Sequence, residues 1–101
     1  AGAPADEIEK VLVRTDVVDD YALQLRLANL QQEVTRVELK HMTRKIAYFT
    51  EVIRNHNGYA ARIDLSDLPH GRYLLEISQQ KESRKVVLRV NEHGLFVSDA
   101  K

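Results

Sequence analysis

Hydrophobic and polar residues alternate along most of this chain, which is the pattern of β-strands that bury one face. The clearest stretch runs from Tyr21 to Leu27, where every second residue is large and apolar while Gln24 and Arg26 fall between them. A helix over residues 21–32 is the alternative, because Leu, Gln and Ala favour helices. The strict alternation favours a strand with one buried and one solvated face.

The same alternation returns after short polar or glycine-containing breaks. It begins at Ile8 and recurs over residues 35–40, 59–65, 72–77 and 85–90, before a short apolar piece at 95–97. Residues 45–53 are apolar at both parities, so this strand is either covered on both faces or interrupted by a bulge. Asn57-Gly58 suits a tight hairpin turn. Residues 45–65 are therefore predicted to form a hairpin.

About seven strands with turns roughly every 8–12 residues predict an all-β fold, a single immunoglobulin-like (Ig-like) β-sandwich of antiparallel strands. A chain of 101 residues has material for one hydrophobic core rather than two. The predicted organisation is a flexible lead-in at residues 1–7, the Ig-like domain at residues 8–97 and a tail at residues 98–101.

Composition narrows the functional classes. The chain has 15 Lys and Arg against 15 Asp and Glu, which argues against a strongly basic surface for nucleic acid or an anionic membrane. It has no cysteine, so neither disulfides nor cysteine metal sites contribute. No apolar run approaches the roughly 20 residues of a membrane span. We therefore expect no nucleic-acid partner and no membrane span.

The chain starts at Ala1, in a small and acidic stretch that reads Ala-Gly-Ala-Pro-Ala-Asp-Glu. A start without methionine fits an exported protein whose signal peptide has been removed, and it equally fits a trimmed expression product. On the first interpretation a signal peptide precedes Ala1 in the encoded protein.

Residues 64–77 read Asp-Leu-Ser-Asp-Leu-Pro-His-Gly-Arg-Tyr-Leu-Leu-Glu-Ile, and residues 84–90 read Arg-Lys-Val-Val-Leu-Arg-Val. Together, over residues 55–90, they resemble the closing half of the C-terminal sorting domains of type IX secretion cargo and related small exported Ig-like bacterial modules. The resemblance rests on Asp-Leu-Ser, then Leu-Pro-x-Gly-x-Tyr, then an alternating strand and a basic strand. The chain departs from that pattern by running on from Asn91 to Lys101 and by lacking a Pro-Asn-Pro start. The resemblance implies an Ig-like fold and a sorting or attachment role.

Five residues of this segment are predicted to have structural roles. Leu65 and Leu68 are expected to close one end of the core, while Pro69 and Gly71 turn the chain. Tyr73 shares the parity of Leu75 and Ile77, which places its ring on the core face. In Greek-key sandwiches such a tyrosine bonds the backbone a few residues upstream, as a tyrosine corner. We expect the Tyr73 hydroxyl to bond the backbone of residues 65–70.

Ser66, Asp67 and His70 offer a nucleophile, an acid and a base within five positions, but one tight polar loop rarely positions a working triad. Turn chemistry is the favoured interpretation, because Ser and Asp bond nearby backbone amides. The chain is accordingly predicted to be no enzyme, with no catalytic residues.

Metal-binding patterns are weak. The four histidines each lie beside a predicted turn, and no pair has the spacing of a compact metal site. They are interpreted as solvated loop residues: His41, His56, His70 and His93. Asp16, Asp19 and Asp20 form an acidic turn without the ligand order of a calcium loop. No metal and no cofactor are predicted.

Basic residues gather in two places. The first group comprises Arg36, Lys40, Arg44, Lys45 and Arg54, and the second comprises Arg84, Lys85 and Arg89. With zero net charge and only six percent aromatic residues, they are interpreted as outward charges that protect sheet edges.

The strand at residues 84–90 is predicted to lie on a sheet edge, with Lys85, Val87 and Arg89 facing outward toward a possible protein partner. These features favour a non-catalytic interaction, sorting or attachment module of an exported bacterial protein, placed in the periplasm or outside the cell. The alternative is an extracellular ligand-binding module for a glycan or a peptide, which an exposed aromatic platform would favour.

Overall fold

The computed structural model describes residues 11–80 and 82–98. The predicted lead-in at 1–7, the predicted strand start at Ile8, Lys81 of the polar turn and tail residues 99–101 lie outside the described part. Eight strands follow one another along the chain. They are β1 (Leu12–Val18), β2 (Ala22–Ala28), β3 (Thr35–His41), β4 (Ala47–Ile53), β5 (Tyr59–Asp64), β6 (Gly71–Ser78), β7 (Ser83–Asn91) and β8 (Gly94–Val97).

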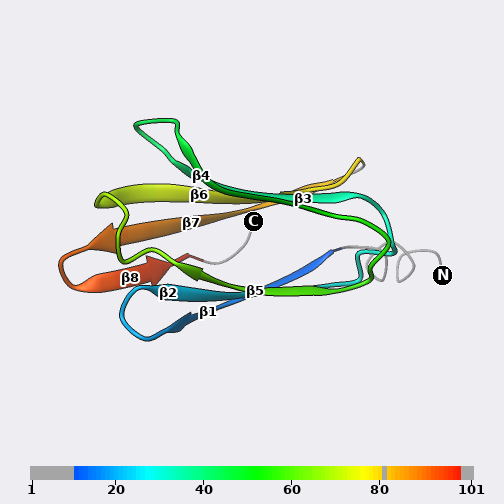
Figure 1. The fold of residues 1–101 in the computed structure, drawn as a ribbon, viewed down its shortest axis with the longest axis horizontal. Coiled ribbons are helices and arrows are strands. Elements are labelled where there is room, and N and C mark those ends of the chain that lie inside the picture. The colour runs from blue at the N-terminus through cyan, green and yellow to red at the C-terminus, as the bar shows by residue number, and fades with distance from the viewer. Residues whose placement is uncertain (1–10, 81, 99–101) are drawn as a thin grey trace.

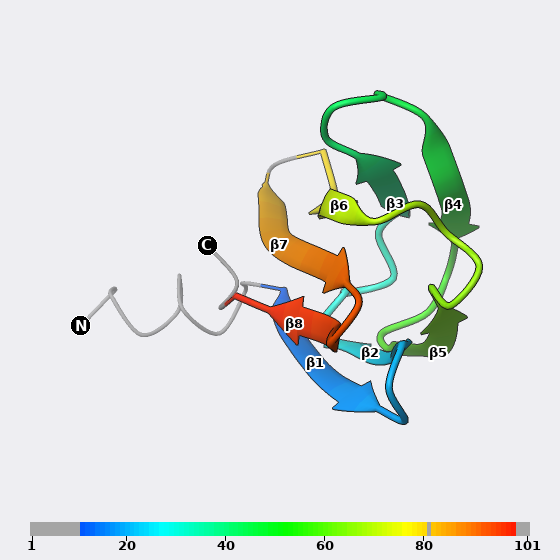
Figure 2. The same ribbon diagram turned by 90° about the vertical axis from the view of Figure 1, so that its left-hand side faces the viewer.

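The strands form two antiparallel sheets that pack face to face, as Figure 1 shows. One sheet has the order β1-β2-β5 and the other has the order β4-β3-β6-β7-β8. The predicted all-β Ig-like sandwich is thereby confirmed, with eight strands in place of about seven. Seen from its end, the sandwich has β8 lying against β1 on one side, while β4 and β5 line the other side (Figure 2).

The alternating residues fill the space between the sheets, as the sequence pattern predicts. Leu23, Leu25 and Leu27 of β2 are almost wholly buried, so residues 22–28 form a strand rather than the alternative helix. Opposite them lie the inward residues of the larger sheet, namely Val37, Leu39, Tyr73, Leu75, Ile77, Val86, Leu88 and Val90. Burial of these apolar side chains is the main stabilising contribution to the fold.

A β-bulge explains why residues 45–53 are apolar at both alternating sets of positions. Leu39 pairs with Phe49, but its neighbour Lys40 pairs with Ala47, so Tyr48 is an extra residue in β4. The bulge turns Tyr48 toward the core, where its ring lies edge-on to that of Tyr73 at 6.0 Å between centroids. Of the two predicted explanations, the bulge is therefore the correct one.

The predicted hairpin over residues 45–65 is wrong. β4 pairs with β3 in the larger sheet, whereas β5 pairs with β2 in the smaller one, so residues 54–58 cross between the sheets. Asn57 anchors this crossing: its carbonyl accepts a hydrogen bond from the Leu30 amide at 2.8 Å and its side chain accepts one from the Gln31 amide at 2.9 Å. Long-range pairing has overridden the local turn signal.

Candidate interaction surface

The loop from Leu65 to His70 carries the chain from the smaller sheet to the larger one and ends in the predicted tyrosine corner. Leu65 is fully buried and Leu68 packs against the core, as the sequence predicts. Tyr73 is fully buried, and its hydroxyl donates a hydrogen bond to the Pro69 carbonyl, which lies within the predicted range of acceptors. The bond links two positions four residues apart and fixes the path of the loop.

His41 is a structural residue and not the solvated loop histidine that the sequence suggests. Its side chain is 5% exposed, and its ring meets that of Tyr73 edge-on at 4.9 Å. Its Nδ1 accepts hydrogen bonds from the amides of Thr43 (3.2 Å) and Arg44 (3.1 Å). An accepting Nδ1 places the ring proton on Nε2, which donates to the His70 carbonyl at 3.2 Å. The ring thus joins two loops.

Gly71 provides the space that this histidine needs. Its φ is +139°, and a Cβ atom built there would lie 2.6 Å from Nε2 of His41. The turn therefore requires glycine both for its backbone conformation and for the close approach of the imidazole ring. The sequence predicted the turn at Gly71 but gave no sign of His41 as its neighbour, because the two residues are far apart in the chain.

The predicted edge at β7 is wrong for the second half of the strand. β7 is the second strand from the margin of its sheet, with β6 on one side and β8 on the other. Arg89 pairs with Phe96 of β8, and the backbone of Val87 is bonded on that side by Ser98. β8 pairs only with residues 88–91, so residues 83–87 of β7, which include Lys85, have no described strand on that side. The alternation of charged and apolar residues over residues 84–90 predicts a strand with one buried and one solvated face. It does not distinguish a strand at the edge of a sheet from a strand next to the edge.

The outer strands of the larger sheet are β4 and β8, and β4 carries a charged residue on its inward side. Glu51 pairs with the inward-facing Val37, so this carboxylate is on the side of the sheet that faces β5. A charged side chain that faces inward at an edge opposes the addition of a further strand. The pKa of the Tyr59 hydroxyl is raised by the burial of Tyr59 and, to a smaller extent, by the negative charge of Glu51.

The outward orientation of Lys85, Val87 and Arg89 is correct, because all three are exposed while their neighbours Val86 and Leu88 are buried. They belong to the outer face of the sheet rather than to its edge. On this face Val87 lies directly across from Leu74, and Arg89 lies between Arg72 and Phe96. We name Arg72, Leu74, Val87, Arg89 and Phe96 the Arg–Phe patch.

The Arg–Phe patch combines exposed apolar surface with positive charge that no described carboxylate pairs. The Phe96 side chain is 51% exposed and Val87 is 37% exposed. Among the described residues, no carboxylate forms an ion pair with Arg72 or Arg89. A shallow depression of about 270 Å³ lies on the patch, with Val97 and Ser98 at its margin. A second depression of about 380 Å³ is lined by Leu74 of the patch together with Lys40, His41, Met42 and Lys45.

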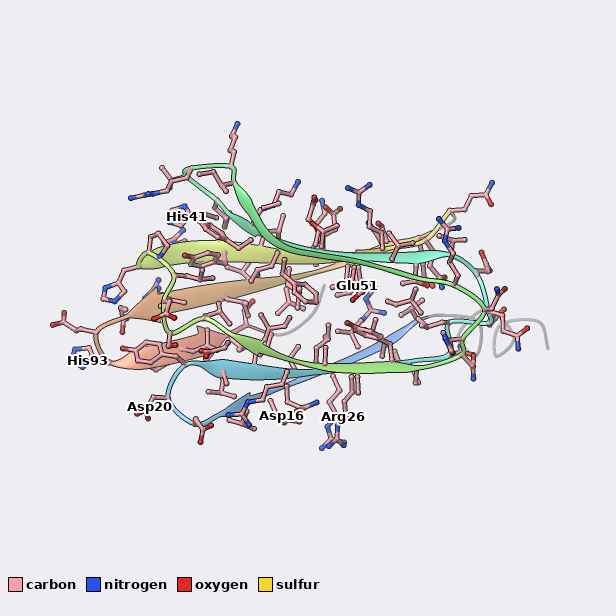
Figure 3. All side chains as sticks on the ribbon, viewed as in Figure 1. Asp16, Asp20, Arg26, His41, Glu51 and His93 are labelled. Carbon is pink, nitrogen blue, oxygen red and sulfur yellow. The ribbon has the colours of Figure 1, made fainter. Side chains whose placement is uncertain are left out.

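Three of the four histidines lie at the same end of the sandwich. His41 and His93 mark this end in Figure 3, and His70 bonds His41 there, while His56 belongs to the β4–β5 crossing at the opposite end. Within the described residues, no three His, Asp or Glu side chains are grouped closely enough to hold a metal ion.

Ser66, Asp67 and His70 lie in the exposed turn before β6. The Ser66 amide donates to Asp64 at 2.9 Å, and the amide and hydroxyl hydrogen bonds from Ser66 lower the pKa of that carboxyl group. His70 contributes its carbonyl to His41. These contacts are the local turn bonds that the sequence suggested, with Asp64 in the role of acceptor.

The acidic turn between β1 and β2 is joined to the other sheet. Asp19 has a φ of 54° and forms an ion pair with Arg62 of β5, within its own sheet, while the next two residues reach the larger sheet. The Asp20 carbonyl accepts a hydrogen bond from the Leu95 amide at 3.1 Å, and the Tyr21 hydroxyl donates to the Asn91 carbonyl at 2.7 Å. Sequence reasoning missed this second tyrosine contact, because Tyr21 and Asn91 are 70 residues apart.

Comparison with known structures supports the fold. The chain is similar to a DUF3244 family protein with an immunoglobulin-like β-sandwich fold from Bacteroides vulgatus ATCC 8482. The identity is 16%, the TM-score is 0.57, and the match covers 89% of this chain and 95% of the other. No known protein family and no curated protein matches the sequence. The chain is thus a small Ig-like module, and its resemblance to type IX sorting domains is not confirmed.

Membrane insertion through a helix receives no support from the described residues, which contain no helix that is long and apolar enough to cross a bilayer.

The stability of the fold is expected to fall in alkaline solution. Burial, and then the neighbouring Tyr48, raises the pKa of the Tyr73 hydroxyl above its usual value of about 10, although Arg44 opposes the shift. The unfolded chain therefore loses this proton first. The stabilising contribution is complete below about pH 10 and is lost as the pH rises toward the pKa of the folded state.

Urea unfolding of the wild-type protein and Tyr73→Phe between about pH 8 and about pH 12 measures this effect. The free energy of unfolding should fall less steeply with pH in Tyr73→Phe, which has no hydroxyl to titrate. The pH profile of Tyr59→Phe is measured alongside that of Tyr73→Phe, because burial and Glu51 also raise the pKa of Tyr59. Identical pH profiles for Tyr73→Phe and the wild-type protein would contradict the prediction.

Proposed function

We propose that this chain is a non-catalytic, Ig-like interaction module of an exported bacterial protein, and that its partner docks on the Arg–Phe patch. The observation that carries the proposal is the exposed ring of Phe96 beside Arg89 and Arg72 on the outer face of the five-stranded sheet. Aromatic and arginine side chains are enriched at the centres of protein interfaces. A sorting or attachment role, as in the type IX cargo domains that residues 55–90 resemble, is the form of this function that we favour.

The surface of the described residues supports a protein partner more than a glycan. Glycan binding calls for a platform of exposed aromatic rings, whereas the tyrosines here are buried or half-buried and Phe96 is the exposed aromatic residue of the described part. Two neighbouring arginines with an aromatic ring beside one of them are better matched to a protein surface with carboxylates and apolar side chains.

Photo-crosslinking in cells of the source organism tests the proposal. A benzoyl-phenylalanine residue at position 87 should capture a partner in the periplasmic or extracellular fraction, while the same residue at position 26, on the outer face of the other sheet, should not. Val87→Lys should weaken capture from a neighbouring cross-linker at position 96 without lowering the melting temperature, because Val87 is exposed. Equal capture from both sheets, or a protein confined to the cytosol, would refute the proposal.

A further inference from the structure

From the charges and side chains of the Arg–Phe patch we infer the chemistry of its partner: an extended protein segment that carries a carboxylate side chain and, two residues away, an apolar one. The carboxylate lies between Arg72 and Arg89, and the apolar side chain packs on Phe96 and Val87. This inference rests on the proposed function and specifies its ligand.

The two neighbouring arginines favour the binding of a carboxylate. Arg72 and Arg89 are directly opposed across β6 and β7, and side chains in this relation have Cβ atoms about 5 Å apart. Like charges in such a pair repel each other, and no described carboxylate is paired with either of them. A carboxylate placed between the guanidinium groups accepts hydrogen bonds from both and removes the repulsion.

The aromatic ring supplies the second contact. Phe96 of β8 lies directly across from Arg89, so Arg72, Arg89 and Phe96 form one row across the three strands. Val87 lies two residues before Arg89 on β7, on the same face of the sheet. The exposed surface of Phe96 and Val87 loses contact with water when an apolar side chain covers it, which is favourable. A ligand that is acidic but wholly polar leaves this contact unmade.

The spacing of the patch fits an extended segment that crosses the strands. Neighbouring strands are about 4.8 Å apart, so the midpoint between Arg72 and Arg89 lies about 7 Å from Phe96. In an extended chain, residues i and i+2 point to the same side and are also about 7 Å apart. Residue i can therefore reach the arginines while residue i+2 reaches the ring.

The other sheet offers a matched control. Arg14 and Arg26 are likewise opposed across β1 and β2, and Arg26 projects from the outer face of that sheet in Figure 3. Here Arg14 already has a carboxylate partner, Asp16, at 3.7 Å. In addition, the residue opposite Arg26 on β5 is Ala60 rather than an aromatic residue. An arginine pair alone is thus present on both faces, whereas the ring beside it is present on one.

Fluorescence anisotropy with three labelled peptides of equal length tests the inference. The first repeats Glu-Ser-Val-Ser, the second replaces every Val with Ser, and the third replaces every Glu with Lys. We expect the wild-type protein to bind the first peptide, to bind the second at least tenfold more weakly and not to bind the third. Added salt should weaken binding of the first peptide, because its carboxylate contacts lie near the surface.

Three variants locate the binding. Arg72→Gln, Arg89→Gln and Phe96→Ser should each weaken binding of the first peptide about tenfold, which corresponds to about 1.4 kcal/mol. Arg26→Gln should leave binding unchanged. All four positions are exposed, so the melting temperature should stay close to that of the wild-type protein, and a melt of each variant checks this.

Several results would overturn the inference. These are equal binding of the first two peptides, equal losses in Arg26→Gln and Arg89→Gln, or a wild-type dimer in sedimentation that Phe96→Ser disrupts, since a second copy would then occupy the patch. If the peptides fail while cross-linking from position 87 still captures a partner, the proposed function stands and the chemistry inferred for the partner is wrong.

Discussion

Tyr73→Ala is expected to lower the free energy of unfolding by about 3–5 kcal/mol, the usual effect of removing a large aromatic side chain from a core. Tyr73 is fully buried, its ring meets those of His41 and Tyr48, and its hydroxyl holds the Pro69 carbonyl. The substitution leaves a cavity and frees the loop before β6. Because small domains have about 5–15 kcal/mol of stability in total, the loss would consume much of it.

Tyr73→Phe separates the ring from the hydroxyl. It retains the packing and leaves the Pro69 carbonyl without its donor, for an expected cost of about 1–3 kcal/mol. The lower part of that range is expected, because Pro69 is half-buried. Urea unfolding of both variants at neutral pH gives the two contributions. If Tyr73→Ala were as stable as the wild-type protein, the ring would not be the core element described here.

Gly71→Ala is expected to cost about 2–4 kcal/mol, from a strained backbone and from displacement of His41. At a φ of +139° a residue with a Cβ atom is strained, and that Cβ would lie 2.6 Å from Nε2 of His41. The ring would have to move, and with it the hydrogen bonds to His70, Thr43 and Arg44. A shift of the His41 ring resonances in nuclear magnetic resonance spectra should accompany the loss of stability.

Gly58→Ala is the control for this prediction. Gly58 has no φ in the left-handed region, and a Cβ there would approach the Leu27 carbonyl oxygen to 3.2 Å, a contact that requires a shift of only a few tenths of an ångström. Its cost should stay below about 1 kcal/mol, the usual range for a substitution without a specific clash. Equal costs at Gly58 and Gly71 would mean that the contact with His41 is not what makes Gly71 necessary.

The candidate site was only partly predictable from the sequence. The outward orientation of Lys85, Val87 and Arg89 followed from alternation alone, and it agrees with their exposure in β7. Their position within the sheet did not follow, because the partner strand β8 is short and its four residues carry a weak pattern. The sequence also did not predict that Arg72 and Phe96 lie beside Arg89, because this depends on the pairing of β6 and β8 with opposite sides of β7.

By itself the sequence determined the strands, their buried faces, the bulge as one of two options and the tyrosine corner. Each of these depends on residues that are close together in the chain, such as Pro69 and Tyr73, so local spacing carries the information. Only the tertiary structure decided which strands pair. It separated β4 from β5 despite Asn57-Gly58, buried His41 beside Gly71 and assembled the Arg–Phe patch. The physical reason is that pairing and packing between distant segments depend on the whole core, whose burial outweighs the preference of any single turn.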